Sequence, residues 1–160
     1  MMMTVALALA LMVQVQVQVQ AGEKPVDAYV ASNAHAGATP FADDGVLRAF
    51  HGRAGVDRVV EDLVNRSIAD PRISDIFKAQ DIVRLRRTLK EQFCYILHGG
   101  CDYTGRDMKA AHKDMGLQQA DMGALVENLQ AAMRKEGVAF FAQNRLLAKL
   151  APIRRDVVER

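Results

Sequence analysis

From Asp44 to the end of the chain, apolar residues recur at intervals of three and four positions, and this spacing limits the possible fold more than any other feature. Such a period places apolar side chains along one face of an α-helix. No stretch of this region alternates strictly between apolar and polar residues with hairpin signals on either side, as a half-buried strand would. The sequence therefore predicts an all-α domain with one core, which a chain of 160 residues can supply.

The expected helices begin and end where this period does. Glycine and proline mark most boundaries, because glycine terminates helices and proline fits only their first turn. Pro152 should kink or divide the last helix, since its ring lacks a backbone donor and collides with the preceding turn. The predicted helices cover residues 46–50, 56–68, a short helix restarted at Asp70-Pro71, 81–97, a brief helix ending near Gly116, 118–135 and 140–158.

The first 21 residues contain no charged side chain and differ in composition from the rest of the chain. Their apolar run, residues 4–13, has about half of the roughly 20 residues that a membrane-spanning helix needs, so we expect no stable membrane span. We interpret residues 1–21 as a signal peptide, with Ala21 near the cleavage point, and expect an exported protein that is periplasmic or secreted. A leader that stays on a cytoplasmic protein is the alternative.

Residues 22–43 are rich in Ala, Gly, Pro, Ser and Asp and show no sustained apolar period, which predicts a linker before a folded domain at 44–160. His35 lies in this segment without a partner at ligand spacing, so we expect a solvated side chain. The formal net charge of +2 is too small and too dispersed to indicate binding to nucleic acid.

Several motifs within residues 44–158 together resemble those of one known protein family. The most specific is the run Tyr103-Thr104-Gly105-Arg106, followed by Met108-Lys109 and then by His112. The others are residues 59–62, residues 69–73, the glycine pair at 99 and 100, and Gly116-Leu117. Together these motifs resemble the group I truncated haemoglobins. The resemblance implies a globin-like two-over-two helical sandwich with haem b, and hence iron, between the two layers.

The resemblance places His112 at the proximal histidine, whose neutral imidazole binds the haem iron and leaves the opposite face open. Phe77 falls at the position of the aromatic ring that packs on the porphyrin. Arg84 and Tyr103 are candidates for the haem propionates, because a guanidinium and a phenol can hydrogen-bond a carboxylate, although both could equally be solvated. The apolar side chains expected along the proximal and inner edges of the haem are Met108, Leu117, Met122 and Val126.

The distal side departs from the better-known pattern of the family. Val64 stands where many members carry Tyr, and Leu89 where they carry Gln; Leu85 and Thr88 are its neighbours. Only Thr88 could donate a hydrogen bond to a bound gas, so the pocket should exchange gases rapidly and discriminate little among them. Three other side chains are not expected over the iron: His51, His98 and Lys90.

The expected function is therefore reversible binding of oxygen or another diatomic gas, NO or CO. A haem-dependent nitric-oxide oxygenase or a peroxidase-like enzyme is the alternative, and the apolar distal side argues against it. A third possibility is a haem-free interaction domain that has kept the globin fold. No motif assigns a reductant.

Cys94 and Cys101 flank the glycine pair at a spacing that differs from the CxxC of redox and zinc sites. In an exported protein they could form a disulfide or remain two thiols, and in the cytosol they would be thiols. A disulfide would join the end of the predicted 81–97 helix to the loop that precedes His112. A Cys/His nucleophile is not favoured, because no third group orients it.

Overall fold

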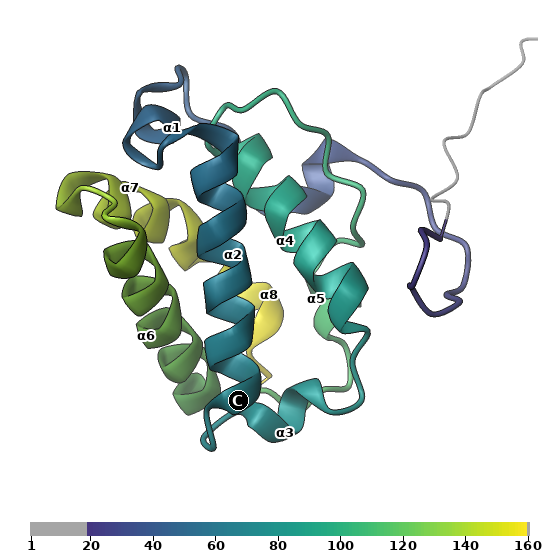
Figure 1. The fold of residues 1–160 in the computed structure, drawn as a ribbon. Coiled ribbons are helices and arrows are strands. Elements are labelled where there is room, and N and C mark those ends of the chain that lie inside the picture. The colour runs from purple at the N-terminus through teal and green to yellow at the C-terminus, as the bar shows by residue number, and fades with distance from the viewer. Residues whose placement is uncertain (1–18, 160) are drawn as a thin grey trace, which may run out of the picture.

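Helices dominate the fold of residues 19–159, the part of the chain that the structure, a computed structural model, describes (Figure 1). Within this part, no helix combines the length and the apolar character that crossing a bilayer requires. The all-α prediction is confirmed. The elements are η1 (Asn33–Ala36), α1 (Gly45–Ala49), α2 (Gly52–Ala69), α3 (Ser74–Phe77), α4 (Ile82–Ile96), α5 (Met108–His112), α6 (Gln119–Glu136), α7 (Phe140–Leu150), η2 (Ala151–Ile153) and α8 (Arg154–Val157).

The first core cluster lies where α2 packs against both α4 and α6 (Figure 1). Its side chains come from the apolar stripes that the sequence shows at helical spacing, and most are less than 5% exposed. Burial of these stripes is what holds the long helices together. Prominent members are Val56, Val59, Val60, Leu63, Phe93, Ile96, Leu129, Met133, Ala142 and Leu146.

The second core cluster is smaller and buries the short helix α5 against the C-terminal end of the chain, where α8 contacts it. Between the two clusters, α4 and α6 carry large apolar side chains that are only half-buried, among them Leu85, Leu89 and Met122. The domain thus has two cores joined by a partly exposed apolar seam. The second cluster consists of Ala36, Tyr103, Met108, Leu117, Ile153 and Val157.

Three helix boundaries differ from the sequence prediction, each for a local reason. α2 begins at Gly52 because His51 turns the chain in a left-handed conformation, with φ of 61°. Pro71 lies in a turn before α3, since Asp70 accepts hydrogen bonds from the backbone N–H groups of the next residues. α5 ends at His112, because Lys113 is extended. Pro152 divides the last helix into α7, η2 and α8, as the sequence predicted.

Residues 23–41, which we call the strap, lie in the segment predicted as a linker but pack along α4 and the loop that leads to α5. Ala36 is fully buried, and the backbone N–H of Phe41 donates to the carbonyl of Ile96 at 2.9 Å. The carboxylate of Glu23 pairs with two arginines of α4 and its side chain is only 1% exposed. Because these contacts are polar and irregular, no apolar period marked the strap in the sequence.

Candidate functional site

His112 is the last residue of α5, and its side chain is half-buried. Asp107 caps this helix by accepting a hydrogen bond from the backbone N–H of Ala110 at 2.9 Å. Nδ1 of His112 lies 2.7 Å from the carbonyl oxygen of Met108, one turn earlier. A carbonyl can only accept, so Nδ1 carries a proton, and in the neutral imidazole Nε2 then keeps its lone pair. This is the tautomer in which Nε2 can bind a metal ion.

The outer flank of α5 faces water. A half-open groove of about 370 Å³ borders His112 between α5 and residues 155–159. Its three positive side chains are matched by three negative ones, so the groove has no charge preference that would select an anion. These side chains are Lys109, Lys113 and Arg155, and Asp114, Asp156 and Glu159.

The predicted distal residues on α4 form an apolar surface. Leu85 and Leu89 lie one turn apart and are both half-buried. The hydroxyl of Thr88 bonds within its own helix, 3.0 Å from the carbonyl of Arg84, so its single proton is engaged. Val64 is 1% exposed and belongs to the first core cluster. The four predicted distal positions therefore offer no free hydrogen-bond donor.

The remaining predicted contacts either belong to the second core cluster, pack against it, or are half-buried elsewhere. Met108 and Leu117 are buried members of the second cluster, and Met122 packs against it. Val126 on α6 and Phe77 at the end of α3 are half-buried. Large apolar side chains that remain partly exposed suit a flat apolar ligand.

The metal-binding side chains near His112 suit a metal ion that a cofactor already coordinates, rather than a bare ion. Among the described residues, no three His, Cys, Asp or Glu side chains gather in a group that could hold a bare metal ion. An iron held by the four nitrogens of a porphyrin needs one imidazole from the protein, and His112 can supply it. The combination of one imidazole lone pair with apolar side chains is thus compatible with haem.

The two predicted propionate ligands have other partners in this structure. The Nε of Arg84 lies 3.3 Å from the carboxylate of Glu23, and the same guanidinium donates to the carbonyl of Lys24. The hydroxyl of Tyr103 donates to the carbonyl of Arg106 at 2.9 Å, and burial raises the pKa of this phenol well above its usual value. Arg84 therefore holds the strap, and Tyr103 supports the loop before α5.

The other histidines and Lys90 also have partners of their own. Nδ1 of His51 lies 3.0 Å from Glu136, Nδ1 of His98 lies 2.9 Å from the carbonyl of Phe41, and Lys90 pairs with Glu61. His35 does not lie in solvent as expected. It is half-buried in η1, with its Nδ1 shielded from water, because the strap packs against the domain.

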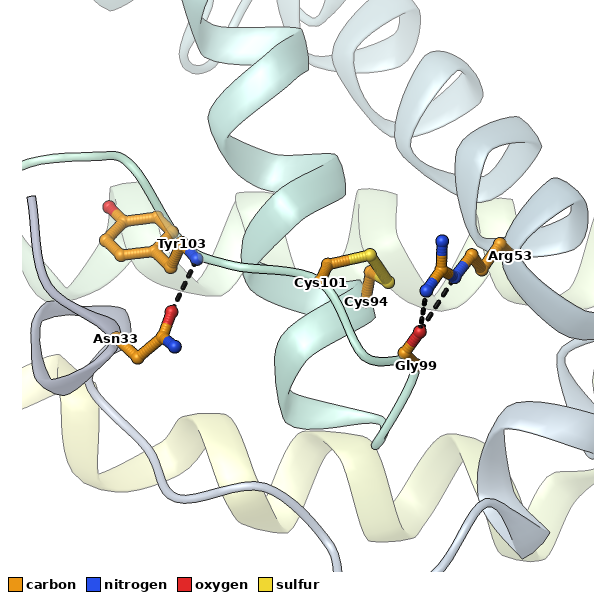
Figure 2. The surroundings of a disulfide bond; sticks show 6 residues. All are labelled: Asn33, Arg53, Cys94, Gly99, Cys101 and Tyr103. Carbon is orange, nitrogen blue, oxygen red and sulfur yellow. Dashed lines mark hydrogen bonds between the residues drawn. A yellow bond between two sulfur atoms is a disulfide. The ribbon is translucent and has the colours of Figure 1, made fainter. Parts of the chain in front are cut away.

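A disulfide between Cys94 and Cys101 joins the end of α4 to the loop of residues 97–107, with the two Cα atoms 5.7 Å apart (Figure 2). The structure thus contains the disulfide, one of the two alternatives that the sequence left open. On one side of the bond, the guanidinium of Arg53 donates to the carbonyl of Gly99 at 2.7 Å. On the other, the side-chain oxygen of Asn33 accepts from the backbone N–H of Tyr103 at the same distance. The loop that leads to His112 is therefore held at three points.

Gln92 is the residue that the sequence reasoning missed. Its side chain is buried on α4, and its Nε2 donates to the carbonyl of Ala36 at 2.8 Å and lies 3.5 Å from the sulfur of Met108. A signal was present, because position 92 falls on the inward stripe between Leu89 and Ile96, where a polar side chain is unusual.

Known proteins match the chain from α1 onward. The bacterial-like globin family matches residues 47–159. A group 1 truncated hemoglobin of Tetrahymena thermophila is 29% identical over 94 residues, which cover 59% of this chain and 78% of that protein. The group 1 truncated hemoglobin GlbN of a Synechocystis species is 32% identical over 91 residues, covering 54% of this chain and 73% of that protein. The crystal structure of a truncated hemoglobin from Tetrahymena pyriformis in its Fe(III) form is 25% identical, with a TM-score of 0.69, and covers 72% of this chain and 98% of that one.

Proposed function

The chain belongs to the bacterial-like globins and has the two-over-two fold of the truncated haemoglobins, which bind haem and diatomic gases such as oxygen, and we propose that His112 is its proximal iron ligand. The observation that carries this assignment is the 2.7 Å contact between Nδ1 of His112 and the carbonyl of Met108. This bond fixes the tautomer and the rotation of the ring, and it raises the basicity of Nε2.

The apolar surface of α4 supports reversible gas binding, for which a haem held by His112 would supply the iron. Leu85 and Leu89 present apolar side chains, and the engaged hydroxyl of Thr88 offers no hydrogen bond that would retain a polar ligand. We therefore propose fast exchange and weak discrimination among O₂, NO and CO. The same surface lacks the polar groups that nitric-oxide oxygenation or peroxide cleavage would use.

Haem reconstitution followed by an absorption spectrum tests the proposal. We expect a Soret band for the wild type and for His51→Ala, a control whose histidine pairs with Glu136 instead. His112→Ala should fail to retain haem, and added imidazole should restore binding in part. A wild type without a Soret band would leave a haem-free helical domain, and unchanged haem content in His112→Ala would reject this histidine as the ligand.

We also propose that the mature protein is exported. The uncharged leader with its short apolar run supports this, and so does the Cys94–Cys101 disulfide, because such bonds persist mainly in oxidising compartments. Mass spectrometry of the native protein should find a chain cleaved near Ala21 and lighter by the two hydrogens lost on disulfide formation. A full-length chain with two thiols in the cytosol would refute export.

A further inference from the structure

The strap contacts the segment that leads to His112 at two successive residues, although it precedes the part of the chain that matches the globin family. The side-chain oxygen of Asn33 accepts the backbone N–H of Tyr103 at 2.7 Å. The hydroxyl of Tyr29 donates to the carbonyl of Thr104 at 2.8 Å. Two backbone groups of this approach segment therefore have hydrogen-bond partners in the strap.

Gln92 connects the strap to the first residue of α5. One amide hydrogen of its side chain is donated to the carbonyl of Ala36, and the other faces the sulfur of Met108. All three residues are buried, so water does not compete for these contacts. Met108 is the residue whose carbonyl holds Nδ1 of His112.

The backbone at Gly37 touches the same methionine. A Cβ atom at this position would lie 2.9 Å from Cγ of Met108 and 3.0 Å from the side chain of Ile153. Gly37 also has φ of 79°, which side chains disfavour. Only glycine lets the strap pass this close to the start of α5.

The beginning of the strap is anchored independently. The carboxylate of Glu23 is buried between Arg84, at 3.3 Å, and Arg87, at 2.5 Å. The hydrogen bond from Arg87 holds the pKa of this carboxyl below its ordinary value, although burial opposes the shift, and the charge of Arg84 contributes. The strap is thus fixed upstream of its contacts with α5.

We propose that the strap and Gln92 are positioning elements for the proximal histidine. They fix the side chain and the backbone of Met108, whose carbonyl in turn sets the ring orientation of His112. This inference rests on the proposed haem function and adds to it a part of the chain that the family match does not include. Loosening the strap should weaken the bond between His112 and iron without removing the ligand.

Two glycine variants separate this coupling from general destabilisation. Gly37→Ala forces a methyl group against Met108, whereas Gly22→Ala, just before the strap, meets only Val83 at 3.8 Å. Both positions have positive φ, 79° and 87°, so both variants carry a similar backbone cost. We expect Gly37→Ala to lose haem to an excess haem scavenger about tenfold faster than wild type. Substitution of a residue that orients a metal ligand typically lowers metal affinity by about this factor or more. It should also shift the iron–histidine stretching frequency, and Gly22→Ala should change neither quantity.

A measurement without haem separates failure of this inference from failure of the proposed function. Amide hydrogen exchange of residues 108–112 in the haem-free protein should be faster in Gly37→Ala than in Gly22→Ala. Gln92→Met keeps the length of the side chain but removes both donors, so it should also speed amide exchange of residues 108–112. This variant replaces Gly37→Ala in the test if Gly37→Ala does not fold. Equal exchange in Gly22→Ala and in both strap-contact variants would overturn the inference, whether or not the wild type binds haem.

Discussion

Breaking the Cys94–Cys101 disulfide should destabilise the domain by an amount that follows from the length of the loop it closes. The two cysteines are seven positions apart. For a loop of this length the chain-entropy relation gives about 2.4 kcal/mol, because the unfolded chain regains the freedom that the bond removed. At about 3 °C for each kcal/mol in a domain of this size, the midpoint of thermal unfolding should fall by roughly 7 °C.

Urea denaturation followed by far-ultraviolet circular dichroism measures this effect directly. The oxidised wild type is compared with the reduced wild type and with Cys101→Ala, which also lacks the bond but leaves the buried Cys94 in place. Cys101→Ala should be insensitive to reductant, which controls for other actions of the reagent. A free energy of unfolding that stays within about 0.5 kcal/mol on reduction would refute the reasoning, since it would mean that the unfolded chain gains nothing when the bond opens.

Two further predictions concern the gas pocket and the response to acid. Leu89→Gln should slow oxygen dissociation about tenfold or more in flash photolysis or stopped-flow measurements, because a hydrogen bond to a partly charged ligand contributes about 1.5–3 kcal/mol; an unchanged rate would place this position away from the gas. Hydrogen bonds from Arg58 and then His51 lower the pKa of Glu136 from 4.5 to about 2, so its contribution to stability is present above pH 4.5 and lost as the pH falls toward 2. Glu136→Gln should flatten the acid-unfolding curve in that window, and a curve identical to wild type would contradict the assignment.

The long helices could be predicted because their burial follows a regular period. The apolar stripes of α2, α4 and α6 became the first core cluster, and Pro152 divided the last helix as expected. The short elements were less predictable. At Pro71 the carboxylate of Asp70 accepts a hydrogen bond from the backbone N–H of Arg72, which favours a turn over a helix start, and composition alone does not rank these two outcomes.

The sequence predicted residues of the candidate site only where a motif or the chemistry of a residue type pointed to them. His112 came from the resemblance, and the structure adds the hydrogen bond that fixes its tautomer. Arg84 and Tyr103 were proposed as propionate ligands because of their chemistry, but chemistry alone does not reveal which partner lies nearer. In the structure Arg84 bonds to Glu23 and the hydroxyl of Tyr103 bonds to the carbonyl of Arg106, and their role toward a propionate stays a prediction. The strap escaped prediction because its partners lie more than fifty positions away along the chain.

Those long separations impose an order on how the chain assembles. Glu23 and Arg84 are 61 positions apart, and Tyr29 and Thr104 are 75. The surface that receives the strap does not exist until α4 and the loop after it have formed, and contacts of high sequence separation form late because closing such loops costs entropy. We therefore expect the strap to dock near the end of folding.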